Sequence, residues 1–239
     1  AQWNGSVSGN EEDFKKSEIA QQKLTKYLSD KEIFAQIKKF KESGIFNNVA
    51  SSDEQSLLLK RQLDVVYNYF LANQADTNLL NEIIAKSTKM EKAYGSYRAQ
   101  LNGKPINDNE VENILHTSVN NKELQAVWES HKGIGKVVVN DLIDLVKMRN
   151  KLAKSLGFDN YHTMSLPLSG QDPKEITAIL DELDQLTSDG FAELKSQMDD
   201  KFAKRYHVKR EELMPWHYQG RYFQEAPDLY PIDLDKYYK

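Results

Sequence analysis

Cysteine is absent from this chain of 239 residues. Disulfides, thiolate zinc sites and a cysteine nucleophile are therefore excluded. Glycine and proline are scarce as well, with 11 and 6 residues. A protein of many short strands needs more turn residues than that, so the scarcity favours an architecture of long helices.

Charge of one sign and long apolar runs are also missing. Lysine and arginine number 32 against 36 acidic residues, which leaves a net charge of -4. Such a chain has no overall positive field to attract a phosphate backbone, and its apolar residues are dispersed among charged ones. The sequence therefore predicts a globular protein with no nucleic-acid partner and no membrane span.

The common catalytic and metal-binding motifs are absent too. A helical zinc peptidase needs HExxH, with two histidines four residues apart and a glutamate between them, and this sequence has none. Neither GxSxG nor a glycine-rich phosphate loop occurs. His207 and Glu211 are four residues apart, but they lie among lysines and arginines, where a surface ion pair is the simpler interpretation. We assign no catalytic residue and no metal ligand.

Apolar residues recur every three or four positions over most of the chain, which indicates amphipathic helices. We predict helices over residues 12–41, from a capping box at 52–55, over 77–101, after Asn107, and over 121–157 with a break near Gly133 and Gly135. Asp172-Pro173-Lys174-Glu175 is the clearest helix start, and about thirty residues from there would form a rod of roughly 50 Å. Residues 1–239 are thus predicted to form a single all-α unit of long antiparallel amphipathic helices.

Residues 214–227 differ in kind from the helices. Aromatic residues, a histidine, amides and prolines mix there without periodicity, as they do in the wall of a binding cleft. A packed aromatic turn is the alternative interpretation.

At this segment the chain resembles the peptidyl-dipeptidase A family, the angiotensin-converting-enzyme-like zinc metallopeptidases. Pro215-x-His217-x-x-Gly220-x-x-Phe223 is similar to the family's P-x-H-x-x-G-x-x-W stretch. Further blocks agree in order and spacing, namely Trp3-Asn4, Lys89-Met90-Glu91-x-x-Tyr94, Val127-Trp128-Glu129-Ser130, and residues 142–158 around Arg149-Asn150. The resemblance covers only the amino-terminal, helical half of the family's chain.

The resemblance implies part of a two-lobed helical hydrolase with a deep cleft, which removes carboxy-terminal dipeptides from oligopeptides with a zinc-bound water. The zinc ligands of the family lie beyond the matching region, so none is transferred to this chain. The resemblance gives a cleft-lining role to His217, Tyr218 and Gln219, and a lid-like role to the first helices. Trp216 replaces the family's alanine, and the family's disulfide cysteines are missing.

We therefore expect the amino-terminal helical part of a zinc carboxypeptidase that releases dipeptides, a fragment inactive alone and binding no zinc itself. Its expected partners are an oligopeptide substrate and the missing carboxy-terminal lobe. The opening AQWNGSVSG suggests a secreted or periplasmic protein after signal removal. We also expect an exposed aromatic surface around residues 216–223. The alternative is a free-standing helical-bundle interaction module without catalysis.

Overall fold

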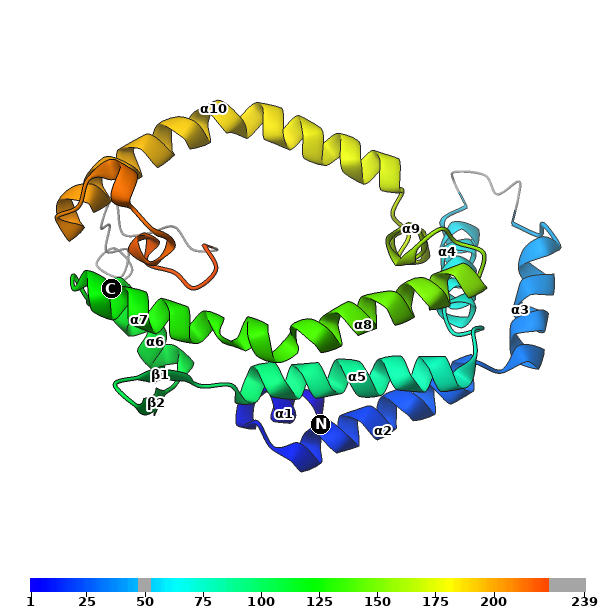
Figure 1. Cartoon of the computed structure of the whole chain (residues 1–239). Coiled ribbons are helices and arrows are strands. Elements are labelled where there is room, and N and C mark those ends of the chain that lie inside the picture. The colour runs from blue at the N-terminus through cyan, green and yellow to red at the C-terminus, as the bar shows by residue number, and fades with distance from the viewer. Residues whose placement is uncertain (47–52, 224–239) are drawn as a thin grey trace, which may run out of the picture. The chain divides into compact units, whose positions relative to one another are not determined.

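The computed structural model describes residues 1–46 and 53–223. Helices form nearly all of the regular structure, so the predicted all-α class is confirmed (Figure 1). Within the described residues, no helix combines the length and the apolar character that crossing a bilayer requires. The elements are α1 (Gln2–Ser8), α2 (Glu11–Leu28), α3 (Lys31–Glu42), α4 (Glu54–Leu71), α5 (Thr77–Ser96), β1 (Ala99–Leu101), β2 (Lys104–Ile106), α6 (Asp108–Thr117), α7 (Asn121–Lys132), α8 (Ile134–Ser155), α9 (Tyr161–Leu168), α10 (Pro173–Tyr206) and the short 3-10 helices η1 (Arg210–Glu212) and η2 (Pro215–Tyr218).

The chain groups into two compact units. The first comprises Ala1–Ser96 and Val138–Leu180, and the second comprises Tyr97–Val137 and Asp181–Lys239. The interpretation of residues 1–239 as one unit stays a prediction.

In the first unit, α2 packs along α5, and α1 contacts both helices (Figure 1). Phe14 of α2 is 3% exposed and packs on Gly5, where a Cβ atom would lie 3.2 Å from the Phe14 ring. A second group of buried residues joins α5, α8 and α9, namely Leu79, Leu80, Leu152, Ala153 and Met164. Asp141 of α8 also forms ion pairs with Lys86 and Lys89 of α5 at 3.0 and 2.7 Å.

The second unit holds the better-packed core. Helices α6 and α7 contact each other and η2, and β1 packs on α7. The core comprises Ala99, Val111, Leu115, Leu124, Val127, Phe202, Tyr206 and Trp216. Four of these side chains, Val111, Leu115, Leu124 and Val127, are completely buried. Segments far apart in sequence therefore meet around one apolar centre.

The prediction of one long helix over residues 12–41 is wrong. The structure ends α2 at Leu28 and begins α3 at Lys31. Asp30 lies between them, and its carboxylate accepts hydrogen bonds of 2.9 Å from the backbone N–H groups of Glu32 and Ile33. A carboxylate that caps the first turn of a new helix interrupts the old one, although the apolar periodicity continues across the break.

The prediction of a helix over residues 77–101 is wrong in its last turn. Helix α5 ends at Ser96, and β1 then pairs antiparallel with β2 through a two-residue turn. Asn102 and Gly103 form that turn with φ values of 51° and 77°. Two successive positive φ values suit a tight hairpin, and Asn-Gly is the pair that adopts them most readily.

Other local signals are confirmed. Asn107 and Glu110 form the expected capping box at the start of α6. The break near Gly133 is present, since α7 ends at Lys132 and α8 begins at Ile134. Asp172 accepts hydrogen bonds from the N–H groups of Lys174 and Glu175, and α10 runs for 34 residues. In the capping box predicted at 52–55, Ser52 lies outside the described residues, whereas Asp53 caps α4 through the N–H of Ser56.

Candidate functional site

The three residues assigned to a cleft wall lie together in the second unit, in and directly after η2. His217 is 2% exposed and lies against Tyr206, with 4.9 Å between the ring centres. Its Nδ1 atom accepts a 2.8 Å hydrogen bond from the backbone N–H of Met214. Burial lowers the pKa of His217, because the charged imidazolium is poorly solvated there. His217 is therefore a neutral ring that fastens the turn at Met214.

Gln219 follows with a left-handed backbone, at φ 60°, and ends η2. Its side chain is 1% exposed, and its Nε2 atom donates a 3.2 Å hydrogen bond to the carbonyl oxygen of His116 at the end of α6. Arg205 of α10 donates a 2.6 Å hydrogen bond to the same oxygen. Gln219 thus connects the segment after η2 to α6.

Tyr218 is only half-buried and belongs to a charged network with α10. Its hydroxyl donates a 2.7 Å hydrogen bond to Oδ1 of Asp199, and Nζ of Lys195 lies 2.9 Å from the same hydroxyl. Burial is the largest single influence on the pKa of Asp199, and by itself it would raise that pKa. The hydrogen bonds from Lys195 and Tyr218 outweigh burial, so that the pKa of Asp199 is lowered. Asp199 is therefore a buried carboxylate that orders Tyr218.

Arg221 connects the end of the described segment to α6 and α7. Its guanidinium pairs with Glu112 and, at 2.8 Å, with Asp108 of α6. It also lies 3.4 Å from Nε2 of His131 of α7. Burial lowers the pKa of His131, and the positive charges of Arg221 and Lys132 lower it further. The site thus combines a neutral buried histidine with a doubly paired arginine.

Sequence reasoning missed this supporting set of Lys195, Asp199, Arg221 and His131. Asp199-Asp200 reads as a solvated acidic pair, but Asp199 is 9% exposed whereas Asp200 is exposed to solvent. The spacing of Lys195 and Asp199, four residues apart on one helix, was the available signal. The cleft-lining role of His217, Tyr218 and Gln219 stays a prediction.

The expected exposed aromatic surface is wrong for Trp216. That indole is 8% exposed and packs edge-to-face on Trp128 of α7, with 6.1 Å between the rings. Tyr222 and Phe223 do remain 40% and 56% exposed. Large exposed apolar residues also lie on α8 and α10, among other helices.

The described residues do not fit a zinc ion. In residues 1–46 and 53–223, no three histidine, aspartate or glutamate side chains lie together so that they could hold a metal. The buried His131 and His217 each direct one ring nitrogen to Arg221 and to the Met214 N–H, respectively, and the second ring nitrogen of each has no hydrogen-bond partner among the described residues. No catalytic step through zinc is therefore derived from these side chains.

Comparison with known protein families gives a match. The family model of angiotensin-converting enzyme, Peptidase_M2, matches residues 1–224. No curated protein and no solved structure gave a match. The matched stretch includes the helices of both units and nearly the whole of the segment that carries His217, Tyr218 and Gln219. This chain therefore belongs to the angiotensin-converting enzyme family of peptidases.

Proposed function

We propose that this chain supplies the amino-terminal helical half of a zinc-dependent peptidyl-dipeptidase. In this proposal it forms a lid and one wall of the cleft for an oligopeptide, and the zinc-binding motif lies in a carboxy-terminal lobe. The family match over residues 1–224 is the observation that carries the proposal. The missing HExxH motif in the 239 residues supports placing the catalytic chemistry elsewhere in the enzyme.

The apolar stripe of α10 supports a missing partner lobe. In the second unit, four large apolar side chains of α10 are between 41% and 73% exposed, namely Leu183, Leu186, Phe191 and Leu194. Their spacing places them on one side of the helix. A soluble protein seldom leaves such a stripe in water, and a neighbouring lobe would cover it.

Helix α8 supports the same proposal in the first unit. Val139, Leu142, Ile143 and Val146 follow the three- and four-residue spacing of one helical face, and each is 43–49% exposed. Leu145 and Leu152 lie on another side of α8 and are buried. A helix with one buried side and one exposed apolar side is typical of an element that packs between two layers.

The hydrogen bonds around η2 support a role as a cleft wall. Met214 is hydrogen-bonded to His217 within the segment 214–219, and Tyr218 and Gln219 attach that segment to Asp199 and His116. A wall fixed before substrate arrives loses little conformational entropy on binding. The half-buried hydroxyl of Tyr218 is the group that a peptide would approach most easily.

We expect the reading frame to continue past Lys239, and the test uses the longer polypeptide that it encodes. We expect this longer protein to contain HExxH and to release dipeptides from a blocked oligopeptide when zinc is present. We expect a chelator to abolish that release. Leu186→Asp in the longer protein should lower the activity at least tenfold, because it places a charge in the covered stripe, whereas Glu182→Gln on the same helix should leave it unchanged.

Two results would overturn the proposal. Zinc-dependent hydrolysis by residues 1–239 alone would place the chemistry within this chain. A stop codon directly after Lys239, together with a monomeric and fully folded product, would favour an interaction module without catalysis.

A further inference from the structure

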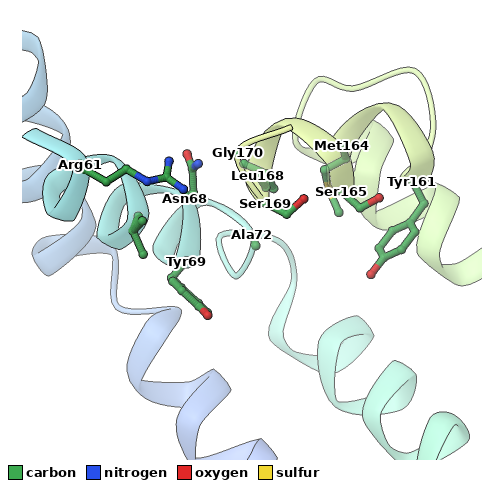
Figure 2. A pocket seen from close by; sticks show the side chains of 11 residues that line it. Arg61, Asn68, Tyr69, Ala72, Tyr161, Met164, Ser165, Leu168, Ser169 and Gly170 are labelled. Carbon is green, nitrogen blue, oxygen red and sulfur yellow. The ribbon is translucent and has the colours of Figure 1, made fainter. Parts of the chain in front are cut away.

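The first unit contains a pocket between α4 and α9 that the peptidase proposal does not use. Its volume is about 470 Å³, within the usual range for sites of small organic molecules. Figure 2 shows Arg61 and Asn68 of α4 beside Leu168, Ser169 and Gly170 at the end of α9. All of its lining residues belong to the first unit.

The end of α9 shapes one side of the pocket. The N–H of Gln171 donates to the carbonyl of Leu166, and the N–H of Gly170 donates to that of Pro167, both at 2.9 Å. This is a Schellman motif, in which the residue at the Gly170 position needs a left-handed backbone. Gly170 has φ 80°, so the turn is formed without strain. The last carbonyls of α9 are thereby already hydrogen-bonded within the helix end.

Gly170 also allows Arg61 to approach closely. A Cβ atom at Gly170 would lie 2.9 Å from one terminal nitrogen of Arg61 and 3.1 Å from the other. Any side chain at position 170 would therefore push the guanidinium away. The guanidinium of Arg61 thus lies beside Gly170, just after the end of α9, among the residues that line the pocket.

The charge of Arg61 is not compensated in the pocket. No aspartate or glutamate lines it. Asp64, one turn further along α4, forms a 2.6 Å ion pair with Lys41. Within residues 1–46 and 53–223, Arg61 forms no ion pair. A planar guanidinium with free N–H groups is suited to bind a carboxylate through two parallel hydrogen bonds.

The rest of the lining is mostly apolar or aromatic. Its apolar members are Val65, Ala72, Met164 and Leu168, and its aromatic members are Tyr69 and Tyr161. The hydroxyls of Ser165 and Ser169 donate to carbonyls of their own helix, those of His162 and Leu166. The pocket therefore offers one positive group at its edge and an apolar surface next to it.

We propose that this pocket binds a small organic monocarboxylate with an apolar or aromatic body. The carboxylate pairs with Arg61 beside Gly170, and the body lies on Met164 and Leu168. This assignment follows from the uncompensated charge and the apolar lining together, and it does not depend on the peptidase activity.

The test titrates the full chain with 3-phenylpropanoate at constant ionic strength and follows the backbone amide signals of Ser169 and Gly170 by NMR. We expect saturable shifts at these amides. The matched alcohol, 3-phenylpropan-1-ol, should bind at least tenfold more weakly, because it cannot pair with the guanidinium. Arg61→Gln should weaken binding of the acid at least tenfold, whereas Lys60→Gln, which removes the neighbouring positive charge on α4, should not.

A second variant tests the apolar part of the proposal. Ser165→Phe keeps Arg61 but fills the pocket, so it should also abolish the shifts caused by the acid. Helical content and thermal midpoint show whether each variant is folded. Equal affinity for acid and alcohol, unchanged binding in a folded Arg61→Gln variant, or the same saturable shifts with chloride alone would each overturn the proposal.

Discussion

The hydroxyl of Tyr218 donates a 2.7 Å hydrogen bond to Oδ1 of the buried Asp199. The two residues belong to η2 and α10, so this bond attaches the aromatic segment of the second unit to its longest helix. Lys195 contacts both partners, since its ammonium pairs with Asp199 and also lies over the Tyr218 ring, 4.6 Å from its centre. The position of the Tyr218 hydroxyl thus depends on two charges of α10.

Removing that hydroxyl should destabilise the protein moderately. We expect Tyr218→Phe to lower the free energy of unfolding by about 1.5 kcal/mol, because the hydrogen bond has a charged acceptor and Asp199 keeps Lys195 as a partner. Urea unfolding measures the change. Tyr69→Phe, which alters a 64% exposed tyrosine, should change it by less than about 0.5 kcal/mol. Equal effects of the two variants would contradict the role of Asp199.

Stability should fall as the pH drops below about 6.5, partly because of His131. Burial, followed by the charges of Arg221 and Lys132, lowers the pKa of His131 in the folded protein. The unfolded chain therefore takes up a proton at higher pH than the folded one. The stabilisation that comes from neutral His131 is complete above the pKa that His131 has in the unfolded chain. It is lost as the pH falls through the pKa that His131 has in the folded protein.

The measurement for His131 is the free energy of unfolding at several pH values between 7.5 and 5. We expect His131→Gln to flatten the pH dependence, since glutamine does not titrate. Val127→Ala serves as the control, because it should lower stability by a similar amount at every pH. A pH dependence that His131→Gln leaves as steep as in the wild type would argue against this assignment.

Core and stripe leucines should respond differently to truncation. Leu115 is completely buried, so Leu115→Ala should lower the free energy of unfolding by about 2–5 kcal/mol. Leu186 is 73% exposed, and Leu186→Ala in this chain should change it by less than about 0.5 kcal/mol. Denaturant titration of both variants checks the contrast, and a large loss in Leu186→Ala would show that the stripe is already covered.

The same stripe should cause self-association. We expect the chain to form oligomers as its concentration rises, because Leu186 and Phe191 expose apolar surface on one side of α10. The double variant Leu186→Ser and Phe191→Ser should shift the sedimentation profile towards the monomer. Thr187→Ser, a polar change on the same helix, should not. A wild-type chain that stays monomeric at high concentration would count against an uncovered stripe.

The start of α9 depends on Asn160. Its side chain accepts a 2.9 Å hydrogen bond from the N–H of Thr163, and the Thr163 hydroxyl accepts one from the N–H of Asn160. Asn160→Ala should lower the free energy of unfolding by about 1 kcal/mol, and Asn160→Ser by less, since serine also caps helices well. Thermal unfolding distinguishes the two, and an alanine variant as stable as the serine variant would show that the cap does not matter.

The sequence predicted those helix boundaries at which one side chain determines the local backbone. Asp172 and Asn107 start α10 and α6 as expected, because a cap acts within its own turn. Asp30 also caps a helix, α3, but the apolar spacing continues past Asp30. The sequence pattern therefore does not reveal the break between α2 and α3. The predicted helix over residues 77–101 is too long, because periodicity alone does not show that residues 99–101 turn back as a strand.

The candidate site was less predictable, because burial there comes from distant segments. Nothing near His217 or Gln219 indicates that α6 and α10 enclose them. The two adjacent carboxylates of Asp199 and Asp200 look alike in sequence, and only the fold distinguishes the buried one. The family resemblance did not depend on burial, because it was found from blocks of residues in a fixed order along the sequence. The match over residues 1–224 confirms that resemblance.

The junction between α7 and α8 has a consequence for sequence variation among relatives. The Tyr97 hydroxyl donates a 2.6 Å hydrogen bond to the carbonyl of Ser130 and occupies the space where a side chain at Gly133 would begin. A methyl group at position 133 and a hydroxyl at position 97 therefore exclude each other. Relatives that keep this junction should carry tyrosine with glycine, or phenylalanine with alanine, so that the two positions change together during evolution.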